Sequence, residues 1–127
     1  MTFILLSAEL VEQIHDVILN PGEIPGRARD RSLEGALARV DNRLTYGMIR
    51  DAFDLAAAYA IAISQGHCFN DGNKRTAHQS MDVCLALNGV HITWTHEDVG
   101  QAIIRSAQRL MDEGELAELL RQRAPRL

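Results

Sequence analysis

The chain has 127 residues and a formal net charge of −4; 46% of its residues are hydrophobic and 24% are charged. This length and composition predict one globular domain over residues 1–127 and exclude low-complexity disorder, because the hydrophobic content is too high for so small a net charge. A mildly acidic chain is also unlike a general nucleic-acid binder, so we expect no direct nucleic-acid partner. Two cysteines, Cys68 and Cys84, are too few for a disulfide scaffold and favour reduced thiols.

The sequence shows no pattern typical of a membrane protein. Its longest hydrophobic run covers residues 55–63, whereas a helix that spans a bilayer needs about 20 hydrophobic residues. Residues 1–7 lack the basic start of a signal peptide. We therefore expect a cytoplasmic protein with no membrane partner.

Helical spacing predicts an all-α fold. The first helix is expected to follow Ser7 as its N-cap and to end at the turn over residues 20–22. His15 and Asp16 are expected on the surface of this helix. The residues that recur at helical spacing and predict its hydrophobic face are Leu10, Ile14, Val17 and Ile18.

Two more helices are predicted before residue 67. A loop over residues 23–29 contains a proline and a glycine, and Ser32 then caps the second helix. The third helix is expected to start near Ile49. It is hydrophobic nearly all round, as is typical of a helix at the centre of a bundle, and Gly66 is predicted as its C-cap.

The second half of the chain continues the helical pattern. A helix over residues 74–88 ends at an Asn-Gly pair, and residues 90–94 form a β-prone stretch, predicted as an extended segment or one edge of a hairpin. Thr95 and Asp98 resemble a capping pair for the next helix. Gly114 is expected to separate that helix from a last one. The whole pattern predicts a compact helical bundle.

The polar segment from His67 to Arg75 carries the most chemical information. It leads into a helix N-terminus, where free N–H groups and the helix dipole favour an anion. Gly72 permits a tight turn and a close approach to a ligand, and Lys74 adds a cation beside Arg75. Positive charge at this end of a helix is unfavourable by up to about 1 kcal/mol unless an anion binds there. The segment therefore predicts a phosphate site.

Three other side chains of the segment extend this prediction. Asp71 is a carboxylate beside the phosphate site, and Mg²⁺ is often held by one or two carboxylates together with substrate phosphates. His67 can act as a general base that takes a proton from an attacking hydroxyl. Phe69 is expected to insert into the core and to anchor the loop. Together these residues predict a site for phosphoryl or nucleotidyl transfer.

Simpler interpretations exist for each of these residues taken alone. A single histidine is more often a surface or hydrogen-bonded residue than a catalytic one, and Asp-Gly is a common turn. The run that starts at Gly72 is similar to the end of a P-loop, but Asn73 stands between Gly72 and Lys74. Position 67 is also not a glycine, so the P-loop motif is excluded.

The Fic/Doc family, and its Doc branch in particular, has a signature that resembles the run His67-x-Phe69-x-Asp71-Gly72-Asn73-Lys74-Arg75-Thr76-Ala77. The resemblance extends more weakly over nearly the whole chain. It implies the small all-α Fic fold, with the motif loop between two central helices. It also implies the use of ATP with Mg²⁺ to modify a hydroxyl group of a protein.

Two positions depart from the family members that transfer AMP. Lys74 stands where those members have glycine, and His78 stands where they have a second arginine. The lysine would occupy a small anion-binding hole and add a positive charge there. The loss of the arginine removes a side chain that can bind phosphate through two hydrogen bonds. The Doc branch shares these departures and is similar to a kinase. It phosphorylates a threonine of elongation factor Tu, with ATP reversed so that its γ-phosphate meets the hydroxyl.

The resemblance assigns roles to the residues of the motif. It implies that His67 is the general base, that Asp71 helps to hold Mg²⁺ and that Phe69 anchors the loop. It also implies a type II toxin that halts translation, paired with an antitoxin whose disordered tail folds as a helix on the toxin. A Fic-type AMP transferase and an inactive nucleotide-binding module remain as alternatives. The residues assigned to the ATP phosphates are Gly72, Asn73, Lys74 and Arg75.

Overall fold

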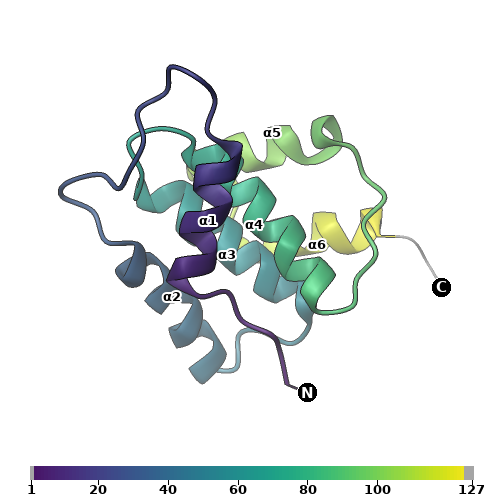
Figure 1. Cartoon of the computed structure of the whole chain (residues 1–127). Helices are drawn as coiled ribbons and strands as arrows, with labels where there is room; N and C mark the ends of the chain where they lie inside the picture. The colour runs from purple at the N-terminus through teal and green to yellow at the C-terminus, as the bar shows by residue number, and fades with distance from the viewer. Residues whose placement is uncertain (1, 125–127) are drawn as a thin grey trace.

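The computed structural model describes residues 2–124, which form six α-helices and no strand (Figure 1). This arrangement confirms the predicted all-α fold. Within the described range, none of the helices is both long enough and hydrophobic enough to cross a bilayer. The helices are α1 (Ala8–Ile18), α2 (Leu33–Thr45), α3 (Ala52–Gly66), α4 (Asn73–Leu87), α5 (His96–Ala107) and α6 (Glu113–Arg123).

α3 is the central helix of the bundle. It packs against α2, α4, α5 and α6, and every residue from 54 to 64 is buried. Because neighbouring helices cover its sides, α3 has no need of a polar face, which explains why its sequence is hydrophobic nearly all round.

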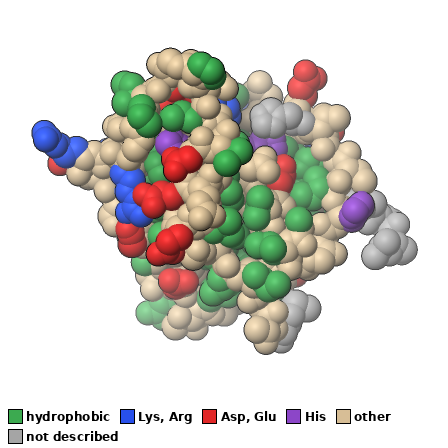
Figure 2. Space-filling view, viewed as in Figure 1, with side chains coloured by type: hydrophobic (Ala, Val, Ile, Leu, Met, Phe, Trp, Pro, Cys, Tyr) green, Lys and Arg blue, Asp and Glu red, His purple; other side chains and the backbone are tan. Residues whose placement is uncertain are grey.

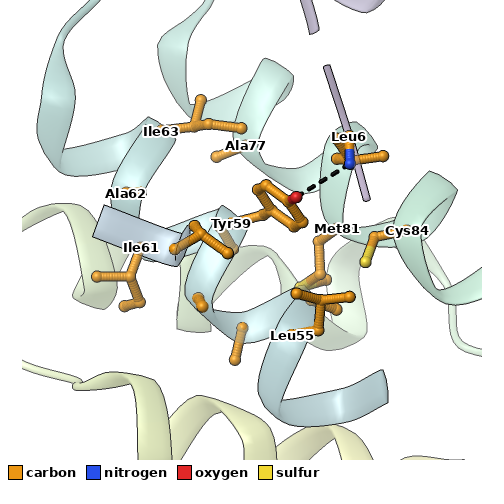
Figure 3. Close-up of a cluster of buried hydrophobic side chains, with 14 of the residues drawn as sticks. Leu6, Leu55, Tyr59, Ile61, Ala62, Ile63, Ala77, Met81 and Cys84 are labelled. Carbon is orange, nitrogen blue, oxygen red and sulfur yellow. Dashed lines mark hydrogen bonds between the residues drawn. The ribbon is translucent and has the colours of Figure 1, made fainter. Parts of the chain in front are cut away.

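Tyr59 is the largest of the fully buried side chains in this core. Its hydroxyl oxygen accepts a hydrogen bond from the backbone N–H of Leu6 at 2.9 Å, and Met81 and Cys84 of α4 lie in the same cluster (Figure 3). Burial raises the pKa of Tyr59 to about 12. The bond satisfies a phenol oxygen that would be costly to bury alone, and it ties the segment before α1 to the centre of the bundle.

The N-caps predicted from the sequence are confirmed. The side chain of Ser7 accepts a hydrogen bond from the first turn of α1, and Ser32 does the same for α2. Thr95 and Asp98 form a complete capping box at the start of α5, in which each side chain accepts a hydrogen bond from the backbone of the other. These caps depend on residues three positions apart, which is why a sequence can reveal them.

The predicted start of α3 near Ile49 is wrong, because the helix begins at Ala52. Asp51 is its N-cap and accepts a hydrogen bond from the N–H of Asp54 at 2.9 Å. Ile49 is buried in the irregular segment between α2 and α3, so its hydrophobic character reflects core packing and not a helical position.

The end of α3 also differs from the prediction. Gly66 is the last helical residue and not the C-cap; the C-cap is His67, with a left-handed φ of 49°. A Cβ atom on Gly66 would lie 2.9 Å from Cys68 Sγ and 3.2 Å from the Cβ of Ala36 on α2. The glycine is therefore needed for close packing between helices, and the sharp turn falls on the histidine.

Gly114 does not separate the last two helices, because it lies in the first turn of α6. Asp112 is the N-cap of that helix. The left-handed residue that ends α5 is Arg109, with a φ of 62°. Arginine is an uncommon residue in this conformation, which is why the sequence pattern pointed to the nearby glycine instead.

The hydrophobic face predicted for α1 is partly wrong. Val17 is 84% exposed, whereas Val11, Ile14 and His15 are buried against the rest of the bundle. The expected face was rotated toward Val17, because the prediction left out the histidine. α1 packs mainly on α4, beside the segment that leads out of α3.

Residues 90–95 connect α4 to α5 without forming helix or strand. The hairpin alternative is therefore wrong for this segment, since the described chain offers it no partner strand. Ile92 and Trp94 are partly buried against the core, and the indole N–H of Trp94 donates to Asp82 at 3.3 Å. The β-prone composition reflects this packing.

Candidate active site

A cavity of about 320 Å³ lies where the chain passes from α3 to α4. It brings together the polar side chains of the predicted phosphate segment. Its lining residues are Ser64, His67, Asn70, Asp71, Gly72, Asn73, Lys74 and Arg75. Ser64 is a buried residue of α3 that the sequence analysis did not single out, because nothing separates it from the other small residues of that helix.

His67 stands exposed at the point where the chain leaves α3. Its left-handed backbone turns the chain out of the helix and carries the imidazole to the edge of the cavity. A residue other than glycine pays about 1 kcal/mol or more for this conformation, although histidine is among the side chains found there more often. Such strain is frequent at functional sites.

Phe69 is buried in the core, where the sequence places an anchor for the loop. The side chain of Asn73 closes the loop around it: Asn73 Oδ1 accepts a hydrogen bond from the N–H of Phe69 at 3.0 Å, and Asn73 Nδ2 donates to the Phe69 carbonyl at 2.9 Å. Because the amide group is used in this clamp, the group that Asn73 can offer to a phosphate is its backbone N–H.

The first turn of α4 is suited to an anion. Gly72 is the N-cap and makes no capping hydrogen bond with a side chain. The N–H groups of a first helical turn have no carbonyl within their own helix to bond. Gly72 has a φ of 78°, and a Cβ atom there would lie 3.6 Å from both His15 and Ile18. The backbone therefore requires glycine and leaves its N–H groups at the cavity.

Two residues of this first turn carry a positive charge, and their side chains differ in exposure and in hydrogen bonding. Lys74 is exposed at the cavity and is the only lysine in the chain. Arg75 is half-buried, donates to the carbonyl of Ile18 at 2.9 Å, and forms an ion pair with Glu23. The hydrogen bond from Arg75 lowers the pKa of the Glu23 carboxyl. Arg75 is thus held by the end of α1 and the loop after it.

Asp71 is the carboxylate that the sequence assigns to Mg²⁺. Its Oδ2 atom accepts a hydrogen bond from the backbone N–H of Ile24 at 2.7 Å, and a carboxylate has further acceptor positions on both oxygens. Among the described residues, no cluster of three or more acidic, histidine or cysteine side chains could hold a metal alone. One hard oxygen ligand fits Mg²⁺, which takes its other ligands from phosphate and water.

The loop over residues 23–29 lies against the motif loop. The N–H of Ala28 donates to the carbonyl of Cys68 at 2.8 Å, and the N–H of Asn70 donates to the carbonyl of Gly26 at 3.1 Å. The two segments thereby form an isolated antiparallel bridge. The Asn70 side chain also donates to the carbonyl of Pro25 at 3.0 Å. Sequence reasoning missed this pairing, because one bridge leaves no alternating pattern.

His15 was expected on the surface, and this prediction is wrong. The residue is fully buried, and its ring stacks on Phe69 with the ring centroids 3.9 Å apart and the planes 7° from parallel. Its Nε2 atom donates to the Asp71 carbonyl at 2.8 Å. The signal in the sequence was its position one residue after Ile14 and four after Val11, which places all three on one face.

His78 does not line the cavity. It is buried in α4, and its Nε2 atom lies 3.6 Å from an oxygen of Asp82, one helical turn away. The position that resembles the second arginine of AMP-transferring relatives is therefore turned toward a carboxylate of its own helix.

The pattern of the Fic/DOC family matches residues 5–85, which is more than half of the chain. The chain belongs to the Fic/Doc family. It is 39% identical over 88 residues to the protein kinase Doc of Escherichia phage P1, and the match covers 68% of this chain and 70% of that protein. The chain is thus a homologue of a protein kinase, and its family motif is the segment that lines the cavity between α3 and α4.

Proposed function

We propose that this Fic/Doc protein is a kinase that transfers the γ-phosphate of ATP to a hydroxyl group of another protein. The observation that carries the proposal is the cavity itself. It places His67 at one edge and Lys74 at the first turn of α4, with Asp71 between them in the chain. A base, a cation and an uncapped helix N-terminus are groups that can deprotonate an acceptor and stabilise the charge of a transferred phosphate.

In the proposed reaction, His67 takes the proton of the acceptor hydroxyl as its oxygen attacks the γ-phosphorus. The bond between that phosphorus and the β–γ bridging oxygen breaks, and ADP leaves. The first-turn N–H groups and Lys74 balance the negative charge on the phosphates. Arg75 contributes after it exchanges Glu23 for a phosphate oxygen, because both compete for the same guanidinium.

Asp71 would hold Mg²⁺ together with the phosphates. The ion would supply positive charge that neutralises the triphosphate. The hydrogen bond between Asp71 and the N–H of Ile24 keeps the carboxylate at the cavity, and the carboxylate retains lone pairs for a metal.

We further propose that the acceptor is a threonine of elongation factor Tu and that the protein is the toxin of a type II toxin–antitoxin pair. The relation to the protein kinase Doc supports this proposal. A translation factor as target implies that the protein acts in the cytoplasm and arrests translation.

The antitoxin is the second partner that we propose. A hydrophobic cavity of about 230 Å³ lies between α1 and α4, with Val17 among its walls. Figure 2 shows hydrophobic side chains gathered between these helices and acidic side chains over α1. An antitoxin tail that folds as an amphipathic helix fits such a surface. Val17→Glu should prevent formation of the complex and leave phosphotransfer unchanged, because Val17 lies outside the cavity of the motif loop.

The test of the kinase proposal is incubation of the protein with elongation factor Tu and γ-labelled Mg-ATP. We expect label on the elongation factor with γ-labelled ATP. With α-labelled ATP we expect no label on the factor. Transfer from α-labelled ATP alone would assign AMP transfer, the alternative that the family resemblance leaves open. Binding of Mg-ATP without any transfer to a cellular protein would leave an inactive nucleotide-binding module.

A further inference from the structure

His15 is a fully buried imidazole on α1 that contacts the motif loop at successive points. Its ring stacks on Phe69, its Nε2 atom lies 2.8 Å from the Asp71 carbonyl oxygen, and its Cδ2 atom lies 3.6 Å from the place of a Cβ atom on Gly72. The family motif that supports the proposed function does not include this residue. A buried polar side chain of α1 therefore contacts the loop that lines the cavity.

The direction of the hydrogen bond follows from its partners. A carbonyl oxygen only accepts, so the Nε2 atom of His15 carries the hydrogen and donates it to Asp71. The peptide between Asp71 and Gly72 is planar and trans, so its N–H points away from its C=O. The bond from His15 therefore sets the direction of the Gly72 N–H, which points away from the imidazole.

This peptide needs such a constraint. Gly72 lines the cavity, and a glycine has more accessible backbone conformations than any other residue. Without a partner for the Asp71 carbonyl, the peptide could rotate, and a ligand would have to supply the free energy of ordering it. The stack on Phe69 adds a second fixed point two residues earlier in the loop.

We propose that His15 is a positioning residue for the nucleotide site: by its hydrogen bond to the Asp71 carbonyl and its stack on Phe69, it orients the Asp71–Gly72 peptide so that the Gly72 N–H meets a phosphate of ATP. This inference rests on the proposed function, because it takes Mg-ATP as the ligand. His15 itself touches neither the nucleotide nor the acceptor.

The test compares two substitutions by calorimetric titration with Mg-ATP. His15→Phe keeps an aromatic ring against Phe69 but has no donor, and His15→Gln keeps an N–H donor near the place of Nε2. We expect His15→Phe to weaken Mg-ATP binding about tenfold, the effect of one lost hydrogen bond, and His15→Gln to bind within about threefold of the wild type. A purely structural role would lower the melting temperature of His15→Phe without separating the two variants in affinity.

A second measurement uses the unsubstituted protein and so does not depend on the folding of a variant. In the ¹⁵N-labelled wild type, the Gly72 amide signal should shift when Mg-ATP is added. An unmoved Gly72 signal in a protein that binds Mg-ATP would overturn the inference alone, as would wild-type affinity in His15→Phe or an equal loss in His15→Gln. If the wild type does not bind Mg-ATP, the proposed function and this inference both fail.

Discussion

Glu23 forms an ion pair with Arg75 at the rim of the cavity, and this pair joins the loop after α1 to the first turn of α4. Arg75 is also a residue that the family motif assigns to the ATP phosphates. In the proposed complex with ATP, a glutamate and a phosphate would therefore compete for one guanidinium. The same loop is fastened a second time where the N–H of Ile24 donates to Asp71.

The competition predicts that Glu23→Gln binds Mg-ATP more tightly than the wild type, by roughly three- to tenfold, because a neutral amide holds Arg75 less strongly and does not repel phosphate. Calorimetric titration measures the change. Glu9→Gln is the matched control, since it removes one negative charge at the opposite end of α1. Weaker binding by Glu23→Gln would show instead that the glutamate is needed to hold Arg75 in place.

The left-handed backbone at His67 predicts a conflict between stability and activity. His67→Gly should raise the free energy of unfolding by about 0.5–1 kcal/mol, because glycine adopts this conformation without steric strain. His67→Ala should leave stability nearly unchanged, since alanine keeps the strain. Both variants should lose phosphotransfer and the growth arrest that depends on it. Urea unfolding measures the predicted change in stability, and transfer of label from γ-labelled ATP measures the predicted loss of activity. Full activity in either variant would refute the base role of His67.

Lys74 can be modified chemically without modifying another lysine, because it is the only lysine in the chain. A reagent that acylates lysine should modify this side chain, and Mg-ATP should protect it. Lys74→Gly should reduce γ-phosphate transfer about 100-fold through the loss of a charge at the phosphates. We expect no gain of AMP transfer, because His78 faces Asp82 and not the cavity. Unchanged kinase activity in Lys74→Gly would show that the lysine does not determine the chemistry.

Arg121 predicts a pH-dependent contribution to stability. It donates to Asp51 at 2.9 and 3.1 Å and also pairs with the buried Asp54, which ties α6 to the start of α3. Arg121→Met should lower the free energy of unfolding by about 1–3 kcal/mol at pH 7, because it removes the nearer of the two guanidinium groups that pair with the buried Asp54. Arg50→Met is the control, since Arg50 is exposed and pairs with Asp54 only at 3.4 Å.

The acid dependence of this contribution follows from Asp51. Burial by itself would raise its pKa, but the hydrogen bond from Arg121 and those from backbone N–H groups outweigh burial and lower it. A lowered pKa in the folded state stabilises the protein above the unfolded value near 4, and this gain is lost as pH falls through the folded value. Urea unfolding should therefore show a smaller difference between wild type and Arg121→Met at pH 3 than at pH 7. A difference independent of pH would contradict this account.

Local patterns account for the parts of the fold that were predicted correctly. Ser7, Ser32 and Thr95 were recognised as N-caps because a cap involves residues only three positions apart. The central position of α3 followed from its uniformly hydrophobic sequence. The predicted helix ends were wrong where a residue other than glycine adopts the left-handed conformation. These left-handed residues are His67 and Arg109, not the nearby glycines.

The sequence by itself determined the helical class, the N-caps at Ser7, Ser32 and Thr95, and the family motif from His67 to Arg75, since each depends on residues close together along the chain. Only the tertiary structure decided that His15 is buried under the motif loop and that Glu23 holds Arg75. Those contacts join residues more than fifty positions apart, and they depend on how α1 packs against α4. Helical periodicity records which side of a helix is hydrophobic, but a polar side chain can be buried wherever another segment supplies its hydrogen-bond partner.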